Sequence, residues 1–235
     1  MSVSEMALAQ GMRETRGALE EWRGNPRPVL RSWLLGGLAF AAALLAAVLV
    51  VASVAQPDLT FLSIPGVSYD ADVQDYFAVV WRNGLVLALH AVACVAGFIA
   101  GSSLPYQAEQ MTGLKRVIHE KARPLAFAWV VGVITFSLVT QAYILGSTGA
   151  SLAEQLRISP GTLVLTVAPH ALTELTAVFL PLAAWTIASR RNEWGNLLAA
   201  TFATVAVAIP MLLVAAAWET LVWPTLLRNA SPALI

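Results

Sequence analysis

Five apolar stretches dominate the chain, and each is long enough to cross a lipid bilayer as a helix. They cover residues 33–56, 82–101, 124–146, 162–188 and 197–222. A hydrocarbon core of about 30 Å requires about 20 apolar residues per helix. Charged residues make up only 12% of the chain, whereas a soluble protein carries about 25%. The sequence therefore predicts an all-α polytopic membrane helix bundle with five spans, residues 33–222.

The segments outside the spans are too short for a separate soluble domain of ordinary size. Within residues 1–32, apolar side chains recur at helical spacing among Arg and Glu; they are Leu8, Met12, Leu19 and Trp22. This pattern predicts an amphipathic helix over 5–23 on the inner membrane surface, with a frayed tail as the alternative. Residues 223–235 are expected to form a tail on the opposite side.

Basic residues fall mainly on one side of the predicted spans, and this side is expected to be cytoplasmic. That side carries Arg13, Arg16, Arg23, Arg27, Arg31, Lys115, Arg116, Lys121, Arg123, Arg190 and Arg191. The opposite side has only Arg82, Arg157 and Arg228. The distribution predicts a cytoplasmic N-terminus and an extracytoplasmic C-terminus. Residues 106–121 combine several of these charges with an apolar face, which favours a contact with acidic lipid or a cytoplasmic partner.

Composition and charge argue against several other kinds of protein. The formal net charge is zero, so no global attraction to nucleic acid is available. The single cysteine, Cys94, excludes an internal disulfide and a cysteine-based zinc cage. In the loop before span two, Asp70 or Asp72 is expected to cap a short helix rather than to bind calcium, because the glycine and distal glutamate of a calcium loop are missing. No cofactor is expected.

Small residues in span two predict close approach of another helix. Ala93, Gly97 and Gly101 recur at four-residue intervals, and such faces let helix backbones touch. Packing within the chain is the default interpretation. A homo-oligomer formed through Gly97 and Gly101 is the alternative.

Ionisable side chains within the spans are costly and are therefore functional candidates. They are Arg82, His90, His170, Glu174 and Glu219, and the predicted topology puts all of them in the outer half of the membrane. His170 and Glu174 share a helix face because they are four residues apart. Together with Asn83 and Pro169, these residues are expected to form an outward-facing polar notch.

Pro169 precedes His170, and its ring is incompatible with an unperturbed helix. The sequence therefore predicts that span four is kinked or broken near Pro169. Residues 162–168 would then form a short or re-entrant piece, and a new helix would start near 169 with free N–H groups beside His170 and Glu174.

Three other interpretations of these ionisable residues are a metal site, a serine protease and structural polar clamps. The order His-Ala-Leu-Thr-Glu over 170–174 is not a zinc-protease motif, and only His90 would be at hand to complete a metal site. No serine is visibly paired with a base. Buried polar clamps, Arg82 with Glu219 and His170 with Glu174, remain an open structural alternative to a functional notch.

The run 168–180, Ala-Pro-His-Ala-Leu-Thr-Glu-Leu-Thr-Ala-Val-Phe-Leu, resembles the Pro-His-Gly-x-x-Glu-x-x-Ala signature of the stage II sporulation protein M family. The similarity extends over roughly 77–225. It includes Arg82-Asn83-Gly84-Leu85, Tyr143-Ile144-Leu145-Gly146 and Glu219-Thr220-Leu221-Val222-Trp223-Pro224. Two departures are Ala171 in place of glycine and Gln141 near a common asparagine.

The resemblance implies a non-catalytic scaffold in a bacterial cytoplasmic membrane. The founding member of that family scaffolds the wall-degrading stage II sporulation proteins D and P, and relatives occur beside genes for MoxR-type ATPases and RDD-family membrane proteins. We therefore expect cell-envelope protein partners and no enzymatic activity. The rival expectation is a transporter or permease subunit that uses the His170 and Glu174 pair. An intramembrane hydrolase would need a nucleophile or metal that the sequence does not offer.

Overall fold

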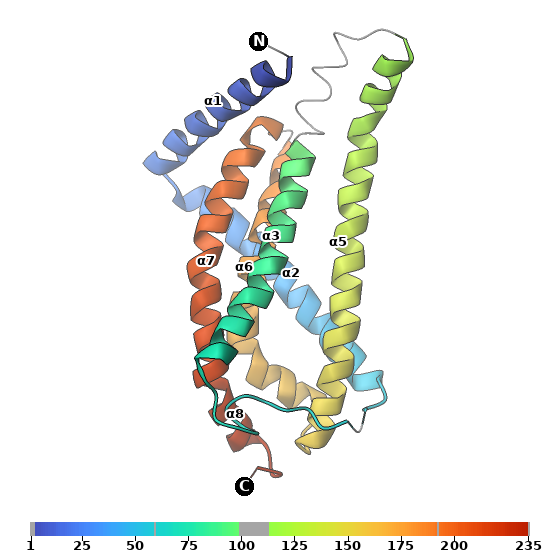
Figure 1. The fold of residues 1–235 in the computed structure, drawn as a ribbon, viewed down its shortest axis with the longest axis vertical. Helices are drawn as coiled ribbons and strands as arrows, with labels where there is room; N and C mark the ends of the chain where they lie inside the picture. Colours follow the sequence, from blue (N-terminus) through green and yellow to red (C-terminus); the bar gives the residue numbers. More distant parts are fainter. Residues whose placement is uncertain (1–2, 59, 99–112, 192, 235) are drawn as a thin grey trace.

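The computed structural model describes residues 3–58, 60–98, 113–191 and 193–234, and the regular elements of these residues are helices, as the sequence predicts. The elements are α1 (Val3–Gly24), α2 (Arg27–Val54), α3 (Val73–Phe98), α5 (Leu114–Gln155), α6 (Pro160–Arg191), the short 3-10 helix η2 (Trp194–Asn196), α7 (Leu197–Leu221) and α8 (Trp223–Ala230). They form an elongated bundle with the N-terminus at one end and the C-terminus at the other (Figure 1). We call these the amino-terminal and carboxyl-terminal ends of the bundle.

Four of the described helices are long and apolar enough to cross a membrane: α2, α3, α6 and α7. They correspond to predicted spans one, two, four and five, so the chain is a multi-pass membrane protein. The third predicted span, 124–146, lies inside α5, a continuous helix of 42 residues. Many side chains in the first half of α5 lie outside the described part of the chain, as do Gly101 and residues 106–112.

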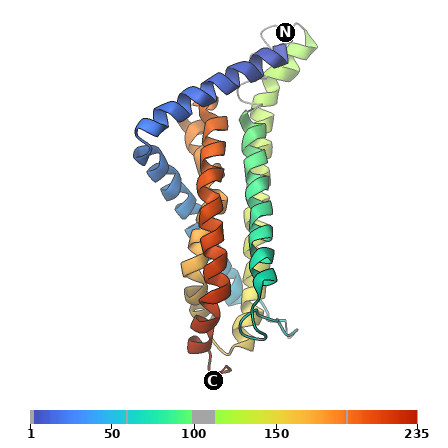
Figure 2. The ribbon, with the colours of Figure 1, turned by 60° about the vertical axis from the view of Figure 1, so that its left-hand side comes forward.

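Helix α6 forms the centre of the bundle. The most apolar window of α6 is 44% buried, compared with 17% for α2 and 22% for α3. Phe179 and Leu180 of α6 are fully buried, and α2, α3 and α7 surround this helix (Figures 1 and 2). Large apolar side chains on the outward faces of the surrounding helices are exposed, among them Leu89, Val139 and Phe202. This pattern suits a bundle whose outer surface contacts lipid.

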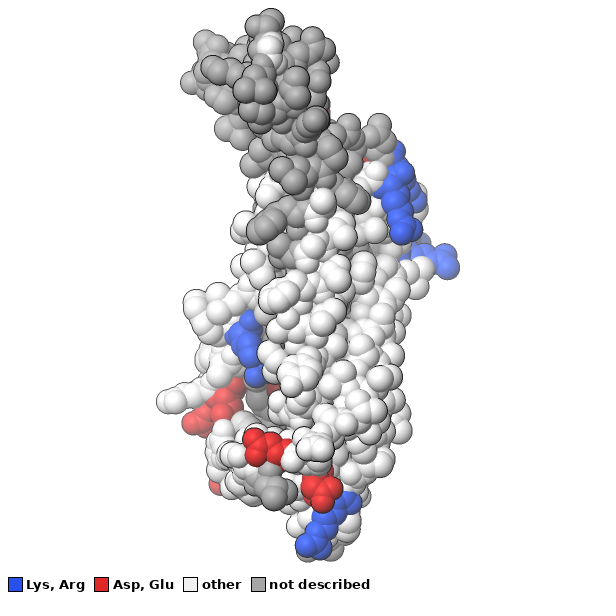
Figure 3. Space-filling model, turned by 90° about the vertical axis from the view of Figure 1, so that its right-hand side faces the viewer, with Lys and Arg blue, Asp and Glu red and all other residues white. Residues whose placement is uncertain are grey.

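The charges in Figure 3 agree with an outer surface that contacts lipid. On the face shown, a broad surface without charged side chains separates charges near the two ends of the bundle, and acidic side chains gather towards the carboxyl-terminal end. An uncharged surface of this kind is what the hydrocarbon region of a bilayer requires.

Helix α6 runs without interruption from Pro160 to Arg191, with Pro169 inside it. The predicted break, and a new helix start near residue 169, are therefore wrong. The start signals lie nine residues upstream, where the Ser159 hydroxyl accepts a hydrogen bond from the Thr162 N–H at 3.0 Å and Pro160 occupies the first helical position. Because an N-terminus already exists there, Pro169 removes only one backbone hydrogen bond from a long helix.

Glycines allow close helix contacts within this chain. A side chain at Gly97 of α3 would collide with the Trp185 indole of α6, and one at Gly37 of α2 would lie 2.9 Å from the Thr176 carbonyl oxygen. Trp185 thus fills the space beside Gly97, as the intrachain interpretation expects. A contact between two copies through Gly97 would require Trp185 to move.

The predicted amphipathic segment forms α1, which lies across the amino-terminal end of the bundle against α7 and η2 (Figure 2). Ala18 is buried there, and the Trp22 ring meets the Trp33 ring edge to face with centroids 5.1 Å apart. The side chains of Leu8 and Met12 lie outside the described part. Contacts with α2 and α7 hold this helix to the bundle.

A folded cap closes the carboxyl-terminal end, where the sequence suggested a loop and a tail. The cap consists of residues 56–58 and 60–72, the turn 156–159 and α8. The Gln155 amide makes two hydrogen bonds with the backbone of Leu62, at 2.8 and 2.9 Å, and the Ser231 hydroxyl donates to the Leu156 carbonyl at 2.6 Å. Ile64, Leu156 and Leu227 share a small hydrophobic core. These contacts hold the chain segments that connect the helices at this end of the bundle in a defined structure.

Asp72 caps α3 itself rather than a separate short helix. Its Oδ1 accepts hydrogen bonds from the N–H groups of Gln74 and Asp75, at 2.7 and 3.0 Å. In return, the Asp72 N–H donates to Oδ2 of Asp75 at 3.0 Å. The Tyr69 hydroxyl also donates to Asp75, which raises the pKa of Tyr69. The reciprocal bonds satisfy N–H groups that a helix start leaves free.

We expect Asp72→Ala to lower the stability of the purified protein by about 1 kcal/mol, because two helix N–H groups lose their acceptor. Asp70→Ala is the matched control, since Asp70 is exposed and lies outside the capping hydrogen bonds. Unfolding midpoints in mild detergent measure both changes. Equal midpoints for the two variants would contradict the assignment of Asp72 as the cap.

Candidate functional site

Four of the predicted notch residues line one cavity near the carboxyl-terminal end of the bundle. Arg82 comes from α3, His170 and Glu174 from α6, and Glu219 from α7. Trp223 of α8 also contributes, and the remaining wall comes mainly from apolar residues of α2, α5 and α6. The volume is about 220 Å³. We call this space the polar cavity.

Three charged groups stand together on one wall of the polar cavity. The Arg82 guanidinium lies 3.8 Å from a Glu219 carboxylate oxygen, with 68% of the Arg82 side chain and 21% of the Glu219 side chain exposed. The Glu174 carboxylate interacts with the amide of Asn83, which is buried, and lies close enough to Arg82 and Glu219 to interact with both charges. Arg82 of α3 thus pairs with Glu219 of α7, and Glu174 of α6 lies beside this pair.

His170 lies deeper than the charged groups and has an unused polar atom. The residue is only 5% exposed, and its Nδ1 has no hydrogen-bond partner among the described residues. The Trp223 ring covers the imidazole with centroids 5.6 Å apart, and the Trp223 indole N–H donates to the Thr166 hydroxyl at 3.3 Å. A buried polar atom without a partner is costly, so this nitrogen marks a place for a ligand atom or a water molecule.

His90 and Pro169 do not belong to the wall of the polar cavity, although both were expected in the notch. The Nδ1 of His90 is hydrogen-bonded to the Val178 carbonyl at 2.9 Å, and its ring stacks on Phe179 at 5.4 Å. His90 therefore ties α3 to α6 inside the core. Pro169 is exposed, and its carbonyl accepts a hydrogen bond from the Thr173 hydroxyl at 3.2 Å.

The described residues contain no group of three or more His, Cys, Asp or Glu side chains arranged to hold a metal ion. Cys94 is buried, and its thiol donates to the Pro181 carbonyl with a sulfur to oxygen distance of 3.3 Å. His170 and Glu174 line the same cavity, but no hydrogen bond joins them in the described part of the chain.

Sequence reasoning missed the contribution of α5 and α8 to this site. Thr148 and Gly149 of α5 line the cavity, and the Trp223 ring of α8 packs against the His170 ring. The sequence does not mark these three residues as part of a site, because threonine, glycine and interfacial tryptophan are ordinary residues of membrane helices. Only the folding of α8 back over α6 brings Trp223 to His170.

The polar cavity combines a mostly apolar wall with a few convergent polar groups, which is the usual design of a binding site. It offers a free imidazole nitrogen, two carboxylates and one guanidinium. Comparison of the whole chain with protein-family models, curated proteins and solved structures finds no match. The functional interpretation therefore depends on the geometry of this cavity.

Proposed function

We propose that the chain is a non-catalytic scaffold of the bacterial cytoplasmic membrane that holds cell-envelope proteins through the polar cavity. The observation that carries the proposal is the buried His170 with its unpartnered Nδ1, placed in one cavity with Glu174, Arg82 and Glu219. A partner atom that pairs with Nδ1 would recover the energy of an unsatisfied polar group. The resemblance to the stage II sporulation protein M family points to the same role.

The size of the cavity favours the side chain of a protein partner over a large substrate. Ligand pockets for small molecules occupy about 300–1,000 Å³, whereas this cavity measures about 220 Å³. A cavity of about 150 Å³ is enough to bind benzene. One anchoring side chain would fill the space, as anchor residues do in protein interfaces.

The partner would approach from outside the cytoplasm. The basic residues of the N-terminal segment favour a cytoplasmic amino-terminal end of the bundle. In that orientation the polar cavity and the cap would lie in the outer half of the membrane and beyond it. Among the partners that the family resemblance favours, wall-degrading enzymes and RDD-family membrane proteins could reach this side, whereas a MoxR-type ATPase would bind on the cytoplasmic side, where ATP is available. The ordered cap supplies a surface beside the cavity.

The proposed topology has five spans, with α5 as the third. Helix α5 is about 63 Å long at 1.5 Å per residue, which exceeds the hydrocarbon thickness, and it includes the apolar stretch 124–146. The positions of the termini at opposite ends in Figure 1 agree with an odd number of crossings. We also propose that Pro169 kinks α6, which is supported by the inclined course of the first part of α6 in Figure 1.

Cysteine labelling tests this topology. In a Cys94→Ala background, a reagent that does not cross membranes should label Thr60→Cys, Glu154→Cys and Pro232→Cys in intact cells, but not Glu193→Cys. All four positions are exposed. If α5 does not cross the membrane, Glu154→Cys and Pro232→Cys become protected and Glu193→Cys becomes labelled.

Site-specific photocrosslinking tests the scaffold. A photoreactive residue at Thr148, which is exposed and lines the cavity, should capture a protein partner in cells. We expect Glu174→Gln and His170→Ala each to reduce the crosslinked product at least about fivefold at equal protein level, the equivalent of about 1 kcal/mol. Glu154→Gln is the control, because Glu154 is exposed and lies outside the cavity wall. Unchanged crosslinking in both cavity variants would refute the scaffold proposal.

A transporter or permease subunit is the second candidate, and the His170 and Glu174 pair within an apolar helix favours it. Proton flux into liposomes that contain the purified protein tests this alternative. A pH-dependent flux that Glu174→Gln abolishes would support transport. Transport would require a path to both sides of the membrane, whereas the residues that line the polar cavity lie towards one end of the bundle. This position favours the scaffold over a transporter.

A further inference from the structure

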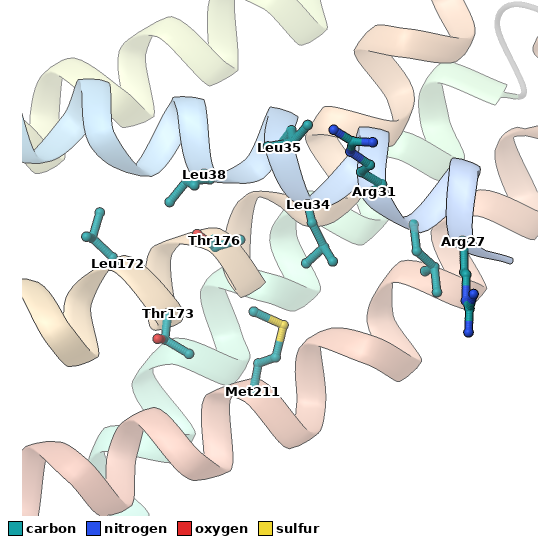
Figure 4. A pocket seen from close by; sticks show the side chains of 10 residues that line it. Arg27, Arg31, Leu34, Leu35, Leu38, Leu172, Thr173, Thr176 and Met211 are labelled. Atoms are coloured by element: carbon teal, nitrogen blue, oxygen red, sulfur yellow. The ribbon is translucent and has the colours of Figure 1, made fainter.

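A second and larger cavity opens between α2, α6 and α7, away from the polar cavity. Its volume is about 750 Å³ (Figure 4). Its wall includes Arg27, Arg31, Leu34 and Leu38 of α2, Leu172 of α6 and Met211 of α7. We call it the α2 groove.

The α2 groove has a charged end and an apolar body. Arg27 and Arg31 stand at one end of the view in Figure 4, and Leu38 and Leu172 stand at the other. Between them, Leu34 and Met211 point towards each other across the groove. The arrangement matches an amphipathic molecule that has one polar end and a long apolar chain.

The length of the groove matches one leaflet of a bilayer. Arg27 and Leu38 are eleven residues apart on α2, which corresponds to about 17 Å along the helix axis. Half of the hydrocarbon core of a bilayer measures about 15 Å. Arg27 is the first residue of α2, so the charged end lies at the level of lipid headgroups when α2 spans the membrane.

The two arginines carry positive charge that no described carboxylate neutralises. Neither Arg27 nor Arg31 forms an ion pair among the described residues, and both are exposed. Their four-residue spacing puts their Cα atoms on one helix face, and their flexible side chains leave α2 in different directions in Figure 4. Arginine binds phosphate well because its planar guanidinium offers paired N–H donors, and basic residues beside a membrane helix favour anionic lipid headgroups.

We propose that the α2 groove binds one anionic phospholipid, with its phosphate at Arg27 and Arg31 and one acyl chain along Leu34, Leu38, Leu172 and Met211. The apolar body orients the chain, and the arginines select the anionic headgroup. The site is independent of the polar cavity, because none of its wall residues lines that cavity.

Native mass spectrometry of the full chain in detergent tests this proposal. Phosphatidylglycerol and phosphatidylcholine with identical acyl chains are titrated separately, and the first bound lipid is quantified. We expect the wild-type chain to bind phosphatidylglycerol at least about fivefold more tightly, because each arginine near a membrane surface contributes roughly fivefold. Arg27→Gln with Arg31→Gln should reduce this preference to less than about twofold.

Two control variants separate the groove from general effects. Arg13→Gln with Arg23→Gln removes the same charge from exposed positions of α1 and should keep the preference. Met211→Trp fills the groove and should weaken phosphatidylglycerol binding, whereas Val214→Trp changes an exposed residue of the same helix that lies outside the groove and should not.

Equal binding of the two lipids by the wild-type chain would overturn the proposal without any variant. A preference that survives in the Arg27 and Arg31 double variant, or that the α1 control loses equally, would also overturn it. None of these measurements involves the protein partner. A negative result would therefore not contradict the scaffold proposal, which the crosslinking experiment tests separately.

Discussion

Replacement of Gly146 by alanine is expected to separate α5 from α2 and to destabilise the protein by about 3 kcal/mol, the upper end for an overpacked core. A Cβ at residue 146 would lie 2.5 Å from the Val51 Cβ, 2.6 Å from the Val51 Cγ1 and 3.0 Å from the Val48 carbonyl oxygen. Valine is stiff at χ1, and a carbonyl inside a helix moves only with its backbone. The two helices must therefore move apart.

Gly132→Ala is the matched control on the same helix. Apart from the backbone of α5 itself, no atom of the described residues lies within 4 Å of a Cβ at that position, and alanine favours a helix over glycine by up to about 1 kcal/mol. The two substitutions add the same methyl group, yet we expect opposite effects on the unfolding midpoint in detergent. A Gly146→Ala protein as stable as the wild type would show that α5 does not pack on α2 in this way.

Loss of the central aromatic ring in Phe179→Ala is expected to lower the free energy of unfolding by about 3 kcal/mol. This value is the lower end of the range for a buried phenylalanine replaced by alanine. Phe179 is fully buried, stacks on His90 and lies 6.0 Å from the Phe40 ring. The lower end applies because lipid tails are as apolar as the protein interior, so the cost comes from lost packing contacts rather than from water.

Phe202→Ala provides the comparison, because Phe202 of α7 is 68% exposed on the outward surface of the bundle. We expect a change within about 0.5 kcal/mol, as for surface positions in general. Unfolding by sodium dodecyl sulfate, followed by circular dichroism, measures both variants. Similar losses for Phe179→Ala and Phe202→Ala would argue against α6 as the centre of the bundle.

The membrane-spanning helices were predictable because their signal is local. A run of about 20 apolar residues has few alternatives to a helix in a bilayer, and α2, α3, α6 and α7 each contain most of one predicted stretch. Helices α2 and α3 nevertheless start at Arg27 and Val73, well before the predicted starts at 33 and 82. Helix boundaries were less predictable. Pro169 suggested a helix start, whereas the Ser159 cap and Pro160 already provide one upstream.

The candidate site was predictable in part. Ionisable residues in apolar stretches are conspicuous, so Arg82, His170, Glu174 and Glu219 stood out, and all four line the polar cavity. His90 was equally conspicuous, but the Val178 carbonyl binds its ring away from the cavity. Which carbonyl a histidine meets depends on how α3 packs on α6, and spacing along one helix does not contain that information.

The sequence by itself determined that this chain is a bundle of apolar helices with a few costly polar groups, since bilayer thickness and backbone hydrogen bonding leave little choice. Only the tertiary structure decided what those groups meet. The crossing of α2 over α6 and α7 creates the α2 groove, and the return of α8 over α6 brings Trp223 to His170. Both depend on contacts between residues far apart in sequence, where small residues, caps and side-chain shapes act together.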